Sequence, residues 1–261
     1  MAKPANGKKT RAQPTTASSP KRILVIDIGG TKMKMLASGQ TEPRKAPSGR
    51  KFTPNQLVTE VREAAKGWKW DAISIGYPGL VGDQGPRSEP GNLGFGWVGF
   101  DYASAFGCPV RIMNDAAMQA LGSYEGGRML FVGLGTGFGS ALIADNVLVM
   151  LELGALPSAN GTPLGETLGQ QGRKRLGRKA WRRMVLDTLP ALMHAFVADY
   201  VVVGGGNAKE FKELPPGVRM GHNLTAFRGG FRLWHVDDVP TMRVDGPPPP
   251  ATSPPQEWRV I

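Results

Sequence analysis

The stretch Arg22-Ile-Leu-Val-Ile-Asp27, followed by Ile28-Gly-Gly-Thr31 and Lys32-Met-Lys-Met-Leu36, decides the predicted fold. Its first part is an uninterrupted apolar run typical of a buried strand, and its last part alternates polar and apolar side chains as a second strand does. The glycines between them favour a tight turn. The segment therefore predicts a β-hairpin rather than a strand that leads into a helix.

The same pattern returns about a hundred residues later in the chain. Met129–Leu134 is an apolar run, Gly135-Thr-Gly-Phe-Gly139 supplies a glycine turn, and residues 140–144 form the returning strand. A turn at Asp145-Asn146 and a further strand over 147–151 follow. Two such hairpins in one chain indicate a duplicated lobe.

Helices and strands alternate over the rest of the folded body, which we place at residues 21–239. Apolar residues at helical spacing predict helices near 55–67 and 116–124, and a longer one over 181–197 that Pro190 should kink or divide. Further strands are expected at residues 72–75, 110–113 and 200–203. This alternation defines the α/β class.

Composition narrows the class of protein. The chain has 261 residues and is 41% hydrophobic, which is enough for a packed core and excludes wholesale disorder. No stretch approaches the roughly 18 uncharged apolar residues that span a bilayer, so we expect no membrane partner. Cys108 is the single cysteine of the chain, which excludes an internal disulfide and a multi-cysteine zinc site. We expect a cytoplasmic protein.

The net charge of +11 is concentrated in two segments. Residues 1–22 hold six cations and residues 173–183 hold seven, with no acid in either. Residues 1–20 lack large apolar side chains and are expected to form a disordered basic tail, and 240–261, with seven prolines, an extended Pro-rich tail. The segment 173–183 has three open interpretations: a solvated helix face, a nucleic-acid contact or a polyphosphate contact.

Three glycine-rich turns are candidate phosphate sites. Backbone N–H groups, a hydroxyl and an ammonium are offered by Gly29, Gly30, Thr31 and Lys32, and Asp27 beside them could hold Mg²⁺. The tandem turn adds Gly135, Thr136 and Gly137, and a crevice after the last strand adds Gly205 and Gly206. The alternative is that these glycines serve only tight turns. Neither hairpin has the spacing of a Walker A loop.

Two carboxylates stand at element boundaries. Asn114 and Asp115 lie where a strand ends and a helix begins, so they are either helix caps or, for Asp115, a base that deprotonates an alcohol. Glu152, flanked by leucines, is either an edge residue in solvent or an acceptor for a sugar hydroxyl. The glycine-rich loop 76–102 suggests backbone packed around a small ligand.

Together these segments resemble the ROK sugar-kinase family, and within it the polyphosphate glucokinase branch. The matching motifs occur in family order and are Asp27-Ile-Gly-Gly-Thr-Lys32, Ile75-Gly-Tyr-Pro-Gly79, Asn92-Leu-Gly-Phe-Gly-Trp97, Asn114-Asp-Ala-Ala117, Leu134-Gly-Thr-Gly-Phe-Gly139, Glu152-Leu-Gly154 and Gly204-Gly-Gly-Asn207. The resemblance implies an α/β, two-lobed, actin-like (ribonuclease-H-like) fold, with lobes at 21–117 and 118–239 and the site in the cleft between them.

The resemblance also implies roles for single residues in transfer of a phosphoryl group to a hexose 6-hydroxyl. Asp115 would be the general base, and the sugar would be bound by Gly79, Asn92, Asn114, Glu152 and, on a looser alignment, Glu166. The phosphates of polyphosphate or ATP would lie against Asp27, Gly29, Gly30, Thr31, Lys32, Gly135, Thr136 and Gly137, with Mg²⁺ on Asp27. In ATP users, Gly205 and Gly206 would line the nucleotide region.

One departure from the family keeps other functions open. The family's Glu-x-Gly-His motif has Ala155 in place of its histidine, so a sugar hydroxyl loses a partner. The expectation is a hexose kinase, with glucose first and no zinc; the alternative is a non-catalytic sugar- or polyphosphate-binding protein. Nucleic-acid binding through the basic segments is a weaker third reading. A homodimer stays an option.

Overall fold

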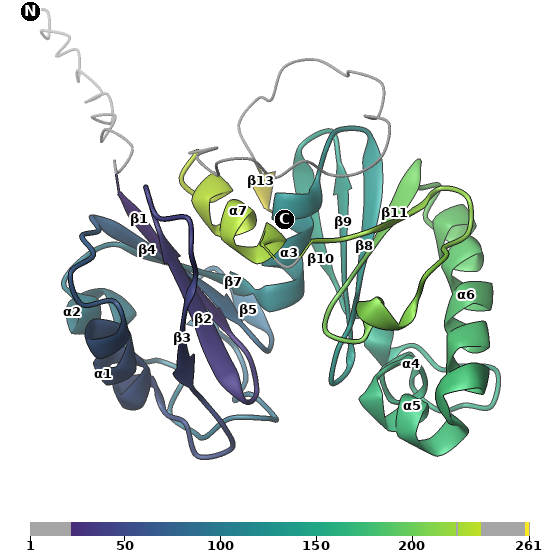
Figure 1. Cartoon of the computed structure of the whole chain (residues 1–261), viewed down its shortest axis with the longest axis horizontal. Helices are drawn as coiled ribbons and strands as arrows, with labels where there is room; N and C mark the ends of the chain where they lie inside the picture. The colour runs from purple at the N-terminus through teal and green to yellow at the C-terminus, as the bar shows by residue number, and fades with distance from the viewer. Residues whose placement is uncertain (1–21, 223, 236–258, 261) are drawn as a thin grey trace, which may run out of the picture.

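The computed structural model of the chain describes residues 22–222, 224–235 and 259–260, and its predicted tails lie almost wholly outside these residues. Two sheets stand on either side of a pair of packed helices (Figure 1). The first sheet has the strand order β3-β2-β1-β4-β7. Its strands are β1 Ile23–Ile28, β2 Lys32–Ala37, β3 Arg44–Pro47, β4 Ala72–Tyr77 and β7 Val110–Asn114. A small hairpin, β5 Val81–Gly82 with β6 Gly85–Pro86, follows β4.

The second sheet repeats the plan of the first, with the order β12-β11-β8-β9-β10-β13. Its strands are β8 Arg128–Leu134, β9 Phe138–Ala144, β10 Val147–Leu151, β11 Tyr200–Gly204, β12 Val218–Met220 and β13 Arg259–Val260. Each sheet is built on an antiparallel glycine-turned hairpin with a parallel neighbour, β1–β2 with β4 and β8–β9 with β11. Both predicted hairpins are therefore present. Residues 259–260 were expected in an extended tail, but they pair with β10.

The helices cover the outer faces of the sheets and fill the space between them (Figure 1). They are α1 Pro54–Ala64, α2 Tyr102–Phe106, α3 Asp115–Ser123, α4 Leu164–Leu168, α5 Gln170–Leu176, α6 Arg178–Ala195 and α7 Thr225–Arg232, with short 3₁₀ turns η1 Leu153–Ala155 and η2 Ala208–Glu210. Of the two outcomes expected at Pro190, division of the helix does not occur, because α6 runs through this residue. Pro190 lies on the exposed face, while Val185 and Leu189 stay packed in the core.

The centre of the molecule is the packing of α3 against α7. A Cβ on Gly122 would lie 1.8 Å from the carbonyl oxygen of Thr225, so only glycine allows this approach. Phe227 and Phe231 of α7 pack into the same core as Val25 of β1. The predicted lobe boundary at 117/118 falls inside α3, and the division into two lobes at that point stays a prediction.

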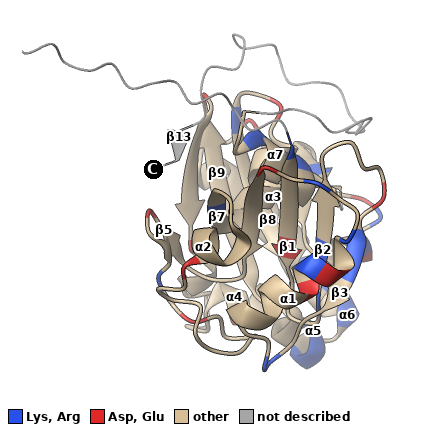
Figure 2. Ribbon diagram, turned by 90° about the vertical axis from the view of Figure 1, so that its left-hand side faces the viewer, with Lys and Arg blue, Asp and Glu red and all other residues tan. Residues whose placement is uncertain are grey.

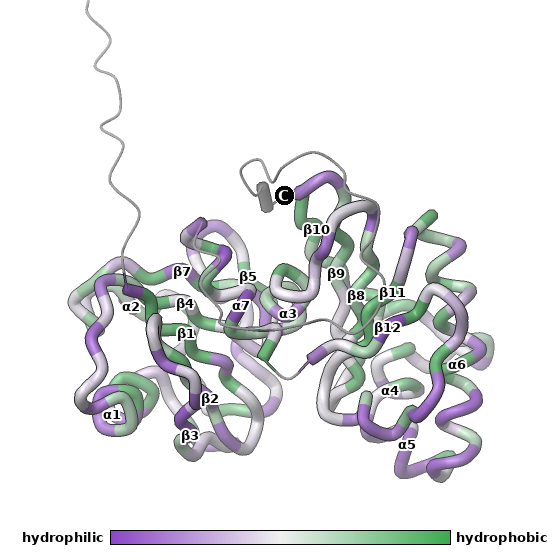
Figure 3. The backbone as a smooth tube through the Cα atoms, turned by 45° about the horizontal axis from the view of Figure 1, so that its top comes forward, coloured by the Kyte–Doolittle hydropathy of each residue, from purple (hydrophilic) through white to green (hydrophobic). Residues whose placement is uncertain are grey.

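The apolar strands lie inside both halves, and hydrophilic residues follow α5 and α6 (Figure 3). None of the helices described is long and apolar enough to cross a membrane.

Candidate active site

A cleft of about 970 Å³ lies where the two glycine-turned hairpins face each other. Its walls come from the carboxyl ends of strands in both sheets, from the start of α3 and from the loops after β11 and β12. The structure brings most of the predicted site residues together here: Asp27, Gly29, Gly30, Gly79, Asn92, Asn114, Asp115, Gly135, Thr136, Gly137, Glu152, Gly205 and Gly206 all line the cleft.

Three residues of the predicted site do not line the cleft. Thr31 and Lys32 lie exposed at the hairpin turn and the first position of β2. Glu166 is exposed on α4, a helix that contributes nothing to the cleft wall. Lys34, two residues beyond Lys32, lines the cleft instead and stands opposite Asp27 in the hairpin register.

Asp115 is the first residue of α3 and lies on the cleft wall. Its pKa is raised to about 7, chiefly by burial and then by the negative charge of Asp27, with a smaller contribution from Glu152, while the backbone N–H of Ala116 lowers it. That N–H donates to Asp115 Oδ1 over 2.8 Å. A carboxylate with a pKa near neutrality exchanges a proton readily, which suits a general base.

Asp27, at the carboxyl end of β1, also has a raised pKa because it is buried, and Lys34 partly offsets that effect. Burial raises the pKa of Glu152 as well. Three carboxyl groups thus line one cleft. Among the described residues, Lys34 is the cation whose charge partly offsets the effect of burial on the pKa of Asp27. Such a site favours a ligand that brings cations with it.

Asn114 is the helix cap, and this leaves Asp115 available for chemistry. Asn114 Oδ1 accepts hydrogen bonds from the backbone N–H groups of Ala116 and Ala117, at 3.0 and 3.1 Å. Its Nδ2 donates to the carbonyl oxygen of Gly79 over 3.1 Å. Asn114 therefore ties the start of α3 to the glycine-rich loop after β4.

Asn92 reaches the cleft from that same loop and packs against the first glycine turn. A Cβ on Gly30 would lie 2.9 Å from Asn92 Nδ2, so the bare glycine makes room for the amide. Asn92 Oδ1 is buried, and no described group donates a hydrogen bond to it. A buried acceptor without a partner costs roughly 1–3 kcal/mol, and a ligand hydroxyl would satisfy it.

The second glycine turn presents bare backbone to the cleft. No described atom lies within 4 Å of the position a Cβ would take on Gly135 or Gly137, apart from their chain neighbours. The carbonyl oxygen of Gly135 accepts from Gln170 N and from Asn207 Nδ2, both at 3.1 Å. The turn is therefore held from behind and open in front.

The described residues contain no group of three His, Cys, Asp or Glu side chains placed to hold a metal ion. Mg²⁺ usually takes one or two carboxylates and completes its shell with waters and substrate phosphates. Asp27 and Asp115, whose charges interact in the cleft, fit that donor set.

Several residues of the cleft were not predicted from sequence. Lys34 could have been found by counting the hairpin register from Asp27, and Gln119 by stepping one helical turn from Asp115. Lys209, in η2, and His222, in the loop after β12, also line the cleft, but nothing in their local sequence marks them.

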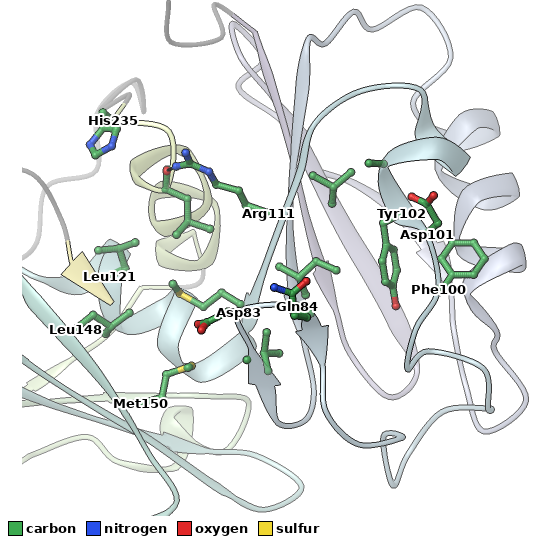
Figure 4. Close-up of a pocket in the computed structure, with 18 residues that line it drawn as sticks. Asp83, Gln84, Phe100, Asp101, Tyr102, Arg111, Leu121, Leu148, Met150 and His235 are labelled. Atoms are coloured by element: carbon green, nitrogen blue, oxygen red, sulfur yellow. Dashed lines mark hydrogen bonds between the residues drawn. The ribbon is translucent and has the colours of Figure 1, made fainter. Parts of the chain in front are cut away.

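A second cavity, of about 520 Å³, lies between the β5–β7 region and β10, and it contains none of the predicted site residues (Figure 4). Leu121, Leu148 and Met150 form one wall. Arg111, which also lines it, stacks over the Trp234 ring at 4.2 Å and donates to the carbonyl oxygen of Leu233. We assign it no role.

The comparisons with known proteins identify the family. The model of the ROK family matches residues 23–156, so the chain belongs to the ROK family. No curated protein sequence matches the chain.

Solved structures share the fold. A polyphosphate/ATP-glucomannokinase from Arthrobacter sp. strain KM matches with a TM-score of 0.69 and 23% identity, over 84% of this chain and 99% of that one. A ROK family glucokinase from Streptomyces griseus, in complex with glucose and AMPPNP, matches with a TM-score of 0.63 and 18% identity, over 81% and 98%. A putative N-acetylmannosamine kinase from Listeria monocytogenes matches with a TM-score of 0.62 and 19% identity, over 82% and 98%. The predicted α/β, two-lobed, actin-like fold is confirmed.

Proposed function

We propose that this protein is a cytoplasmic hexose kinase that transfers a phosphoryl group to the 6-hydroxyl of glucose. The observation that carries the proposal is Asp115, a carboxyl group with a pKa of about 7 that faces a cleft between two glycine turns. Phosphoryl transfer asks a protein mainly to align the alcohol, accept its proton and neutralise phosphate charge.

Each part of the cleft has a task in this mechanism. Asn92 and Glu152 hold sugar hydroxyls, and Asn92 Oδ1 gains the donor that it lacks. Asp115 accepts the proton of the attacking hydroxyl. The backbone N–H groups of the second glycine turn face the donor phosphates. Mg²⁺, held by Asp27 and the phosphates, would neutralise part of the charge on the transferred group.

Polyphosphate is the donor that we favour over ATP. Lys and Arg residues are concentrated along α5 and α6 (Figure 2). Arg173 and Arg178 are engaged with Glu210, at 2.6 and 2.5 Å. The other cations of the segment have no buried carboxylate partner among the described residues, and Arg183 makes a long 4.0 Å contact with the exposed Asp187. They are Lys174, Arg175, Lys179, Arg182 and Arg183. They offer a polyanion a charged surface along α5 and α6.

The decisive experiment is a coupled assay for glucose 6-phosphate with Mg²⁺, in which polyphosphate and ATP are supplied separately. Formation of glucose 6-phosphate with either donor supports the kinase, and the ratio of kcat/KM values assigns the donor. If no hexose is phosphorylated by either donor, the hexose kinase is excluded.

A charge-reversal variant tests the basic surface formed by Lys174, Arg175, Lys179, Arg182 and Arg183, and the ion pairs of Glu210 determine which residues it should include. Reversing Arg175, Lys179 and Arg183 to Glu avoids Arg178, whose loss would leave Glu210 without one of its partners. We expect a higher KM for long polyphosphate and an unchanged KM for ATP, with a smaller effect at high salt because exposed charges are screened within about 8–10 Å. Equal damage with both donors would show that the surface is structural.

A non-catalytic binding protein is the second candidate, and Ala155 favours it. Ala155 lies in η1, and no residue of the segment 153–166 contributes to the cleft wall. A sugar bound beside Glu152 would therefore receive no hydrogen bond from this segment. Calorimetric binding of glucose without turnover would support this candidate.

A further inference from the structure

Glu210 is the most buried carboxylate with cationic partners in the described chain, and the proposed reaction does not use it. It ends the short η2 turn that follows the glycine crevice after β11, and only 6% of its side chain is exposed. Arg173 of α5 reaches its Oε1 at 2.6 Å, and Arg178 of α6 reaches its Oε2 at 2.5 Å. One carboxylate thus fastens two helices to the loop after β11.

These contacts belong to a closed ring that includes the second glycine turn. Asn207 Nδ2 donates to the carbonyl oxygen of Gly135 over 3.1 Å, and Arg173 donates to Asn207 Oδ1 over 3.3 Å. The first residue of α5, Gln170, donates its backbone N–H to the same Gly135 oxygen over 3.1 Å. The ring therefore runs from Gly135 through α5 and Arg173 to Asn207, with Glu210 securing Arg173.

The ring adds to the other bonds of this turn, which are the β8–β9 pairing, the bond from the Gly135 N–H to the Gly137 carbonyl oxygen and the bond from the Asn207 N–H to the Leu134 carbonyl oxygen. The Gly135–Gly137 turn has no side chain except that of Thr136, and its front is open to the cleft. The carbonyl oxygens of Gly135 and Thr136 accept hydrogen bonds from Gln170 N of α5, and the Gly135 oxygen also accepts one from Asn207 Nδ2 in the loop after β11. Backbone N–H groups bind a phosphate well only when they are held in one orientation beforehand.

We propose that Glu210 is a positioning residue for the phosphoryl donor, because it locks Arg173 and Asn207 so that the backbone of the Gly135–Gly137 turn is fixed in its donor-binding orientation. This rests on the proposed function only in taking the turn as the donor site. In this proposal Glu210 does not touch the donor, and its carboxylate forms ion pairs with Arg173 and Arg178.

The direction in which Glu210→Gln changes the affinity for the phosphoryl donor distinguishes a positioning role from a purely electrostatic one. Glu210→Gln keeps the shape of the side chain but removes a negative charge near an anion site and frees two arginines. If charge alone mattered, the variant would bind a phosphate donor more tightly. Positioning predicts the opposite, a weaker donor site.

The test measures KM for donor and for glucose, kcat and the melting temperature of Glu210→Gln, with Glu213→Gln as the matched control. Glu213 is exposed and has no ion pair among the described residues. We expect a donor KM about 10-fold higher in Glu210→Gln, a change in glucose KM under about twofold, and no change in the control. A donor KM that is unchanged or lower overturns the proposal, as does an equal rise in both KM values.

A second variant covers the case in which Glu210→Gln does not fold. Asn207→Ala breaks the ring at its contact with Gly135 without exposing the buried carboxylate, and it should raise donor KM in the same way. Arg178→Gln, which leaves the ring itself intact, should raise donor KM less than Asn207→Ala. The reverse order would contradict the ring.

Calorimetry with tripolyphosphate keeps the two proposals distinguishable. If the native chain phosphorylates no hexose, the kinase fails, but the ring is still judged by tripolyphosphate affinity, which should fall about 10-fold in Glu210→Gln. Equal affinity in variant and native protein, or no binding of tripolyphosphate by the native protein, would overturn the inference.

Discussion

The hairpins β1–β2 and β8–β9 have the same topology, but the first places charged side chains at the cleft and the second does not. Both are antiparallel pairs closed by a glycine turn, and both turns line the cleft. The first sets Asp27 opposite Lys34, so it brings fixed charges to the cleft. The second sets Gly133 opposite Gly139 and lines the cleft with backbone, the Thr136 and Ser140 residues and the Phe138 ring, without a charged side chain. A repeated fold has thus given one site a charged wall and a wall of backbone amides.

The largest expected effect lies between the two hairpins, at Asp115. Asp115→Asn should lower kcat about 10²–10⁴-fold, because the amide cannot accept the proton of the alcohol. The fold should survive: burial raises the Asp115 pKa, so the charged form lowers the free energy of unfolding above about pH 4, and its removal should leave or raise the melting temperature. Retained turnover in this variant would return Asp115 to a capping role.

The same substitution in the two glycine turns should separate structure from function. A Cβ on Gly29 would lie 2.8 Å from the carbonyl oxygen of Lys32, whereas one on Gly135 meets no described atom within 4 Å. Gly29→Ala should therefore lower the free energy of unfolding by about 1–3 kcal/mol. Gly135→Ala should change it by less than about 1 kcal/mol and instead raise donor KM, because the methyl group faces the cleft.

Thermal unfolding and donor KM, measured on both variants, check this difference. Equal loss of stability would mean that the second turn is as tightly packed as the first.

A smaller effect is expected past the second hairpin, at Ala155. Ala155→His should lower KM for glucose about 2- to 10-fold, because a hydrogen bond to a sugar hydroxyl contributes about 0.5–1.5 kcal/mol. Glucose KM and kcat with a single donor are the measurements, and Asp115 should still be required. An unchanged KM would show that the η1 segment does not reach the sugar.

The smallest expected effect is a shift of pH dependence caused by the charged hairpin. Asp115 acts as a base only when ionised, so kcat/KM should fall as the pH drops below about 7. Asp27 raises the Asp115 pKa, and Asp27→Asn should therefore move the midpoint of the pH profile of the remaining activity to lower pH. A midpoint that does not move would mean that burial alone sets the Asp115 pKa.

The regular elements could be predicted because their signals are local. The apolar runs of β1 and β8, the glycine turns after them and the start of α3 at Asn114 all depend on neighbouring residues. Most of the cleft followed, since the glycine turns and strand ends meet at one place once the hairpins are known.

The parts that sequence reasoning missed depend on distant contacts. The continuity of α6 through Pro190 comes from the packing of its buried face. Glu210 forms ion pairs with Arg173 and Arg178, which lie more than thirty positions away in the sequence. The sequence therefore could not show that two of the seven cations in 173–183 are already paired with a carboxylate. Lys209, in η2, and His222, in the loop after β12, reach the cleft only because of the tertiary fold.

The seating of α7 on β1 has a consequence for how the chain folds as it is made. Gly230 lies directly over Val25, and Ser74 Oγ donates to the carbonyl oxygen of Gly230 over 2.6 Å. The first sheet is complete at Asn114 and α7 begins at Thr225, so the face that α7 covers lacks this helix until about 110 more residues have been synthesised, which takes about 5–20 s at ordinary translation rates. During that interval the apolar surface that α7 will cover is open, and such a surface is prone to aggregation.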